Sequence, residues 1–287
     1  MNKKSWLVYA LVTTTFWGVW GALIEIPEKA GFPATLGYVI WALTMIIPSV
    51  VALKIINWQL DRNKKSILFG LIIGFLGAAG QLILFHALKT GPAYLVFPFV
   101  SLSPVATILL SLWLLKERAS TIAWIGIILA LIAIPLLSYQ PSQNGQSSGS
   151  LWILLSLIVF LLWGAQAYFM KVANEHMKAE SIFFYMMVSG IAFIPLAVSM
   201  TDFSQRINWG FKGPWMAAAI QMLNSIGALF LVYAFRYGKA IVVSPLTNAG
   251  APVITIVLSL IIYGVFPHLI VLIGMILAVV AIFLLAK

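Results

Sequence analysis

The sequence predicts an all-α membrane protein of ten transmembrane helices, arranged as two inverted five-helix repeats. Of the 287 residues, 62% are hydrophobic and 8% are charged, too little charge to cover the surface of a soluble protein of this length. The apolar residues occur in runs of about 20, the length of a helix that crosses a hydrocarbon core of roughly 30 Å. The second half of the chain also repeats the pattern of the first at a nearly constant offset.

Ten apolar runs are long enough to cross a membrane. The first follows a short basic start, but it is too long for the apolar region of a secretory signal. It also lacks an Ala-x-Ala cleavage pattern, so we interpret it as a membrane span. The expected spans are residues 6–25, 34–56, 66–88, 92–115, 120–138, 151–171, 180–200, 213–235, 240–263 and 268–286.

The internal repeat shows most clearly in proline, tryptophan and glycine. Pro98 corresponds to Pro245 at an offset of 147 residues, and the dipeptide at Trp17 returns at Trp163 at an offset of 146. Because each half contains five spans, an odd number, the second half must enter the membrane from the opposite side. The expected organisation is a first repeat over residues 1–140, a polar linker over 141–150 and a second, inverted repeat over 151–287.

The charge pattern predicts the orientation. A net charge of +10 raises the question of nucleic acid as a partner, but the basic residues stand singly or in pairs between apolar runs. They are therefore loop charges of a protein embedded in a lipid bilayer, and we expect no nucleic-acid partner. With the N-terminus in the cytoplasm, thirteen of the seventeen Lys and Arg residues are inside and four are outside. This predicts a multi-pass protein of the cytoplasmic (inner) membrane with both termini in the cytoplasm.

Polar and aromatic residues inside the spans are the candidates for substrate contact, because burying polar groups in lipid is costly unless they face a cavity or a partner. Several occupy corresponding positions of the two repeats, such as Trp20 with Gln166 and Ser101 with Asn248. The alternative is that the amides only hydrogen-bond between helices and the indoles only fill gaps between them. The candidate substrate-binding residues are Trp17, Trp20, Gln81, Ser101, Trp163, Gln166, Asn224 and Asn248.

Two further groups of residues have candidate roles. Glu25, His86 and Tyr94 fall near the predicted outer face, where they would form a vestibule or carry a coupling proton, or simply lie at the lipid headgroups. Pro98 and Pro245 interrupt the fourth and ninth spans. They are candidate hinges, or structural kinks closed by neighbouring helices.

Small residues mark one face of the fifth and tenth spans. Gly126 and Ala130 recur as Gly274 and Ala278, with the four-residue spacing that lets helices approach closely. The pattern leaves open whether these faces pack within the molecule or form a homodimer through spans five and ten.

Short motifs occur along nearly the whole chain: Phe-Trp-Gly at 16–18, Leu-Trp-Gly at 162–164, the turns at 87–93 and 234–240, and the segment 103–118. In these motifs the chain resembles the EamA-like branch of the drug/metabolite transporter superfamily. This resemblance implies ten helices and the movement of small organic metabolites. One departure concerns Glu117, which closes the motif in the first repeat, because the corresponding residue in the second is Val265. We therefore expect Glu117 to form a salt bridge at the inner end of the molecule, with no corresponding salt bridge at the outer end.

These features favour a secondary transporter that moves a small neutral, zwitterionic or cationic metabolite by alternating access. The alternative is a membrane scaffold or receptor that binds a small ligand at the repeat interface without transporting it. Enzyme chemistry has little support, because His86, His176 and His268 are scattered and the chain has no cysteine. We expect a small-molecule substrate as the partner, with no cofactor, no metal and no catalytic residue.

Overall fold

The computed structural model describes residues 5–91, 93–139, 151–264 and 266–286, without the side chains of residues 93–95 and 98. The described residues form helices and no strand. Among these described residues, seven helical segments can cross a membrane by length and composition, and there are three shorter apolar helices, at 99–113, Thr121–Leu137 and Leu269–Leu285. The prediction of ten apolar spans is therefore confirmed. The linker at 141–150 lies outside the described residues.

The first repeat contains eight helices in its five spans. They are α1 (Ser5–Leu23), α2 (Glu25–Lys29), α3 (Ala34–Thr44), α4 (Ile46–Ile55), α5 (Lys64–Thr90), α6 (Ala93–Ser101), α7 (Ser103–Trp113) and α8 (Thr121–Leu137). The second repeat contains α9 (Leu151–Asn174), α10 (Ala179–Ala192), α11 (Ile194–Ser199), a π-helical turn (Phe211–Trp215), α12 (Met216–Tyr237), α13 (Ala240–Tyr263) and α14 (Leu269–Leu285).

Proline accounts for where the spans bend. The second span breaks at Met45, just before Pro48, and the seventh breaks at Phe193, just before the corresponding Pro195. Proline lacks the N–H that would continue the helix and is tolerated in a first helical turn. The fourth span also breaks, between α6 and α7, whereas α13 runs unbroken through Pro245. The hinge role predicted for Pro98 falls on a side chain outside the described residues, and for both prolines it stays a prediction.

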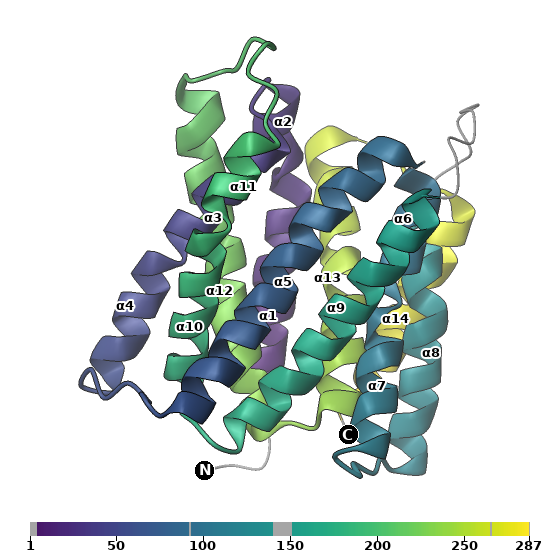
Figure 1. Cartoon of the computed structure of the whole chain (residues 1–287). Helices are drawn as coiled ribbons and strands as arrows, with labels where there is room; N and C mark the ends of the chain where they lie inside the picture. Colours follow the sequence, from purple (N-terminus) through teal and green to yellow (C-terminus); the bar gives the residue numbers. More distant parts are fainter. Residues whose placement is uncertain (1–4, 92, 140–150, 265, 287) are drawn as a thin grey trace.

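The two ends of the bundle are distinguished by the ends of the chain. We call the end that carries the start of α1 and the end of α14 the terminal face, and the other end the opposite face (Figure 1). The terminal face also carries the α9–α10 and α12–α13 turns. The opposite face carries the α5–α6 turn and the loop from 200 to 210.

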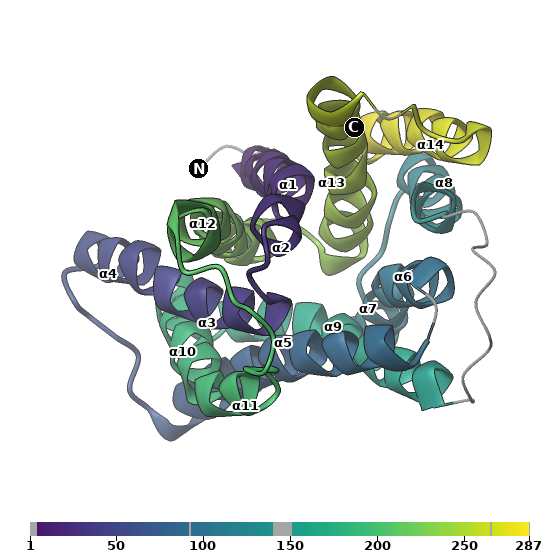
Figure 2. The same cartoon turned by 90° about the horizontal axis from the view of Figure 1, so that it is seen from above.

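The first helix of each repeat packs against helices of the other repeat. α1, from the first repeat, packs along α12 and α13 of the second, and α9 packs along α5, α6 and α7 of the first (Figure 2). We call α1, α12 and α13 the α1 unit, and α9, α5, α6 and α7 the α9 unit. α8 and α14 pack against each other beside these units, and their small-residue faces lie in that contact. A Cβ at Gly126 would lie 2.9 Å from Leu285 Cγ, and one at Gly274 would lie 2.9 Å from Leu136 Cβ. A homodimer through these spans stays a prediction.

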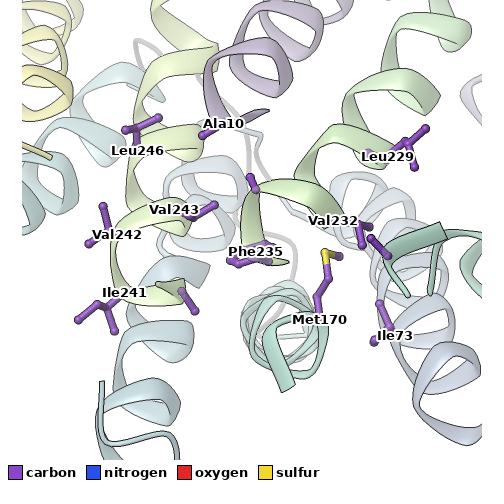
Figure 3. Packing of buried hydrophobic residues seen from close by; sticks show 14 of the residues in the cluster. Ala10, Ile73, Met170, Leu229, Val232, Phe235, Ile241, Val242, Val243 and Leu246 are labelled. Carbon is purple, nitrogen blue, oxygen red and sulfur yellow. The ribbon is translucent and has the colours of Figure 1, made fainter. Parts of the chain in front are cut away.

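The two units meet in the terminal half of the molecule. There α9 packs on α12 and α13, and α7 packs on α13. Met170, Val232, Phe235 and Ile241 are all buried in the resulting apolar cluster (Figure 3). In the opposite half, the described residues of α1 make no comparable packing contact with α5, α6 or α7. The described structure is therefore closed at the terminal face.

Candidate functional site

Trp17 and Trp163 perform the same structural task in the two units. The Trp17 indole N–H donates to the carbonyl of Asn224 at 3.3 Å, and the Trp163 N–H donates to the carbonyl of Gly77 at 3.4 Å. Each indole lies against a glycine, Gly227 for Trp17 and Gly80 for Trp163. A Cβ at Gly227 would come within 2.6 Å of Trp17 Cδ1, so the ring fits only because glycine is there.

The glycine that follows each tryptophan contacts the third helix of its unit. The hydroxyl of Thr255, on α13, donates to the carbonyl of Gly18 at 2.9 Å. The hydroxyl of Thr107, on α7, donates to the carbonyl of Gly164 at 3.0 Å. The Trp-Gly dipeptide thus bonds two neighbouring helices at once, and it does so in both repeats. These contacts hold each unit together as one body.

The next turn of α1 and of α9 carries the polar part of the site. Trp20 Nε1 donates to Gln221 Oε1 at 3.0 Å, and Gln166 Nε2 donates to the carbonyl of Ile73 at 3.1 Å. Trp17 and Trp20 with the α12 segment that holds Gln221 form one Trp–amide cluster, and Trp163 and Gln166 with α5 form the other. The four side chains from α1 and α9 are all partly exposed; they are Trp17, Trp20, Trp163 and Gln166. No hydrogen bond between described residues joins the two clusters.

Gln221 is absent from the residues selected by sequence. It is buried, at 6% exposure, and it fixes the direction of the Trp20 indole. Its counterpart at an offset of 147 is Gly74, so comparing polar residues between repeats does not find it. The available signal was an amide within an apolar run of α12, one turn before Asn224.

The other predicted residues are distributed over both units. Gln81 lies on α5, one turn beyond Gly77, and is partly exposed, as is Asn224 on α12. Ser101 accepts a hydrogen bond from the Ser138 hydroxyl at 3.2 Å. Asn248 donates from its amide to the Ser244 carbonyl of its own helix at 2.9 Å. The structure therefore places Trp17 and Trp20 against α12, and Trp163 and Gln166 against α5. Ser101 is bonded to Ser138, and Asn248 is bonded to its own helix, so neither is bonded to these clusters.

The residues predicted for the vestibule lie at the opposite face. Glu25 pairs with Lys29 at 2.5 Å, and both side chains are exposed. His86 is exposed near the end of α5, and the side chain of Tyr94 lies outside the described residues. Their vestibule or coupling roles stay predictions.

Two open cavities lie beside the loop from 200 to 210 at this face, and not at the Trp–amide clusters. They measure about 490 and 340 Å³ and share Arg206 in their linings. In the same loop, hydrogen bonds from the Ser204 hydroxyl and backbone amide lower the pKa of the exposed Asp202. This side chain therefore stays ionised at neutral pH.

The side chains of the two Trp–amide clusters are indoles and amides. Within the described residues, no group of three or more His, Asp or Glu side chains is placed to hold a metal ion. Indole faces, amides and helix carbonyls can stack on, orient and hydrogen-bond a small molecule. The described Lys and Arg residues lie at or beyond the ends of the spans.

Comparisons with known proteins agree with this architecture. The model of the EamA-like transporter family matches residues 4–139 and again residues 150–287. The protein MJ1333.1 of Methanocaldococcus jannaschii is 30% identical over 132 residues, which are 46% of this chain and 95% of that protein. Protein LicB of Haemophilus influenzae is 24% identical over 210 residues, 70% of each chain.

The fold also has a counterpart among solved structures. A crystal structure with 18% sequence identity superposes with a TM-score of 0.78, covering 99% of this chain and 97% of that one. At this identity the likeness shows the fold alone. The double family match shows more, since it spans both halves. The chain therefore belongs to the EamA-like transporter family, within the drug/metabolite transporter superfamily, and is a multi-pass membrane protein.

Proposed function

We propose that this protein is a secondary transporter that moves a small organic metabolite across the cytoplasmic membrane by alternating access. One observation carries the proposal. Two symmetry-related Trp–amide clusters lie within the membrane spans, one in each unit, and the described residues of the two units pack on each other in the terminal half. Transporters built from inverted repeats bind substrate near the bilayer midplane at the repeat interface. Rocking of the α1 unit against the α9 unit would open that interface to each side in turn.

The proposed substrate is neutral, zwitterionic or cationic, such as an amino acid, an amine or a nucleoside-like compound. Indole faces attract cations by about 0.5–2 kcal/mol each, depending on desolvation. An ionised phosphate or carboxylate would need a basic partner, and the described basic side chains are at the ends of the spans. The roles proposed for Gln81, Gln166, Asn224 and Asn248 are to orient the bound molecule between the indoles.

The proposed orientation places the terminal face in the cytoplasm. Lys29, Lys89, Arg206 and Lys212 lie at the opposite face, and the other described basic residues lie at the terminal face. Lys3, Lys4 and Lys287 lie outside the described residues. Short cytoplasmic loops carry the excess of Lys and Arg in membrane proteins, which supports this choice.

The test is a ligand screen followed by flux. Purified protein is first screened by thermal shift against amines, amino acids, nucleosides and sugar phosphates, because a compound that binds the folded state raises Tm. Labelled forms of the compounds that bind are then offered to proteoliposomes. We expect saturable flux of a neutral, zwitterionic or cationic compound. Binding without flux would instead indicate a receptor or scaffold, and tight binding of a sugar phosphate would contradict the charge argument.

A further inference from the structure

The junction of α1, α3 and α12 contains hydrogen-bond donors that have no acceptor. Trp20 Nε1 donates to Gln221 Oε1 at 3.0 Å, and this bond fixes which way the Gln221 amide is turned. An indole N–H can only donate, so the amide oxygen must face it and the two N–H groups of Nε2 are left for another partner. Among the described residues, Gln221 Nε2 has no such partner. Gln221 therefore offers two donors at this junction.

A second donor on α3 is also unpaired. The indole nitrogen of Trp41 is fully buried, and no described group accepts a hydrogen bond from it. The hydroxyl groups of Thr44 on α3 and Ser225 on α12 are hydrogen-bonded at 3.0 Å, and Ser225 is one turn beyond Gln221, so the two helices are in contact at this level. Buried donors in folded proteins are nearly always paired with protein or water. The α3–α12 contact is therefore a place where an acceptor from outside the chain can bind.

The start of α13 shows how the chain supplies an acceptor where backbone donors need one. The two carboxylate oxygens of Glu117 accept the amide N–H groups of Ala240 and Ile241, each at 3.1 Å. These are the first amides of α13, which have no acceptor within the helix. This cap takes the place of the salt bridge expected for Glu117 from the sequence. No described side chain provides an acceptor of this kind for Gln221 Nε2.

The backbone beside Gln221 leaves room for further atoms. A Cβ at Gly37, in the first turn of α3, would have one described neighbour within 4 Å, Gln221 Nε2 at 3.7 Å. In the other repeat, at an offset of 147, Gly37 corresponds to Phe184 and Gln221 corresponds to Gly74. A Cβ at Gly74 would lie 2.5 Å from Ser189 Cβ, so that junction is tightly packed. We call the space between Gly37 and the Gln221 amide the Gly37 niche.

The Trp–amide cluster of the α9 unit has the opposite hydrogen-bonding character. Gln166 Nε2 donates to the carbonyl of Ile73 at 3.1 Å. A carbonyl can only accept, so the amide nitrogen of Gln166 must face it and the amide oxygen is left for another partner. Gln166 corresponds to Trp20 in the repeat, yet its cluster offers an acceptor where Gln221 offers donors. The two halves of the candidate site are therefore related in position but differ in chemistry.

We propose that the Gly37 niche binds an oxygen of the substrate that carries no proton, and that Gln221 selects for this oxygen. The oxygen is that of a carbonyl group or of the carboxylate of a zwitterion, whose own ammonium group balances the charge. The Gln166 oxygen and the indole faces then bind the N–H or ammonium end. This inference rests on the proposed function, because it gives a direction to the molecule bound at that site.

The first experiment compares probes that differ only at the oxygen end. Purified protein is titrated with amino acids, with their amides, and with the amines that remain when the carboxyl group is removed, and affinity is read from the rise in Tm. We expect at least one amino acid or amide to bind about tenfold more tightly than its amine, the ratio expected for the loss of one hydrogen bond to a charged group. Equal affinities, or no response to any amino acid or amide, would refute the niche.

Gln221→Glu tests the polarity without removing the bond to Trp20. The glutamate still offers one oxygen to Trp20 Nε1, but its second oxygen replaces the N–H groups, repels a carboxylate and attracts an ammonium group. We expect affinity for the amino acid to fall about tenfold and affinity for its amine not to fall. Gln221→Leu should abolish the preference. Gln205→Leu, which removes an exposed amide from the loop at the opposite face, should leave the preference unchanged.

Gly37→Ala tests the space itself. The added methyl group would lie 3.7 Å from Gln221 Nε2, an ordinary contact, so the Tm of the unliganded protein should not fall. Affinity for the amino acid should fall about fivefold through crowding of the niche, and affinity for the amine should stay the same. If Gln221→Glu does not fold, this variant decides.

The outcome that overturns the role of Gln221 is an unchanged ratio of amino acid affinity to amine affinity in these variants. A loosened fold would weaken the binding of both probes and leave that ratio as it was, so it counts against the niche as well. If the parent protein shows the preference but no flux in proteoliposomes, transport is refuted and the niche stands.

Discussion

At the scale of single residues, glycine and tryptophan are matched in pairs. The Trp17 indole packs on Gly227 of α12 and the Trp163 indole packs on Gly80 of α5, so each ring fills the space between two helices. Without a hydrophobic driving force between helices in lipid, such close packing and the hydrogen bonds around it supply the association energy. The conspicuous Trp-Gly dipeptides therefore have a structural role that is independent of any ligand.

Adding a methyl group at these glycines should destabilise the protein. Gly227→Ala and Gly80→Ala place a Cβ against an indole ring, at 2.6 Å from Trp17 Cδ1 in the first case. We expect each to cost about 1–3 kcal/mol through overpacking, seen as a lower Tm of the purified protein. Gly190→Ala is the matched control, because its Cβ would be 3.8 Å from its nearest neighbour. An equal fall in Tm for the control would refute the packing explanation.

Trp20 differs from Trp17 because its N–H meets a side chain, Gln221, instead of a helix carbonyl. Trp20→Phe keeps an aromatic ring but removes the donor that fixes its direction. With a compound identified by the screen, we expect affinity to fall about fivefold, which is about 1 kcal/mol, the typical contribution of a hydrogen bond. Binding is measured by titration, with folded yield as the control. Unchanged affinity in a well-folded Trp20→Ala protein would exclude this ring from the pocket.

The candidate site was only partly predictable from sequence. Correspondence between repeats selected Trp17 with Trp163 and Trp20 with Gln166, and the two members of each pair do occupy equivalent places in the two units. It could not select Gln221, because its counterpart is glycine. The packing of α1 on α12 and of α9 on α5 depends on contacts between residues that are far apart in the sequence, and local sequence patterns do not encode such contacts.

At the scale of helices, sequence predicted the spans closely, because a run of apolar residues of fixed length is a strong signal. The expected span 66–88, for example, is α5, Lys64–Thr90. The breaks were harder to predict. Proline stands within both the fourth and the ninth spans, yet only the fourth is divided into two helices. Tertiary packing decides whether a proline interrupts a helix.

The threonine contacts of the two units should be energetically equivalent. Thr255→Val and Thr107→Val each remove one hydrogen bond to a glycine carbonyl with little change of shape. Interhelical hydrogen bonds in membranes average about 0.6 kcal/mol, so we expect each variant to lose about that much. The losses should add in the double variant, since the sites lie in different units. Unfolding free energies are compared with those of Thr121→Val, an exposed control. Unequal or strongly non-additive losses would argue against two equivalent units.

At the scale of the whole molecule, apolar side chains cover the outside of the bundle. Phe283 on α14 is 71% exposed and Ile276 is 66% exposed, on a helix with no charged residue. Lipid, not water, is the solvent that such a surface matches. Aromatic residues such as Trp58, Trp209 and Phe266 are exposed near the two ends, where membrane proteins contact the headgroups.

The orientation can be checked with single cysteines in this cysteine-free chain. Gln205 is exposed in the loop at the opposite face, and Glu175 is exposed at the terminal face. In intact cells, we expect a membrane-impermeant maleimide to label Gln205→Cys and to leave Glu175→Cys unlabelled until the cells are permeabilised. The reverse pattern would place the termini outside and contradict the charge bias.

The exchange of helices between repeats also has a consequence for biosynthesis. Trp17 bonds to a residue that follows it by 207 positions. At a translation rate of about 5–20 residues per second, α1 waits roughly 10–40 s in the membrane before its partner helix has been made. During that interval the face of α1 that carries Trp17 and Gly18 has none of its final neighbours. The face of α5 that packs on α9 likewise lacks its neighbour until α9 has been made. The ribosome therefore releases a chain whose first helix is among the last to be assembled.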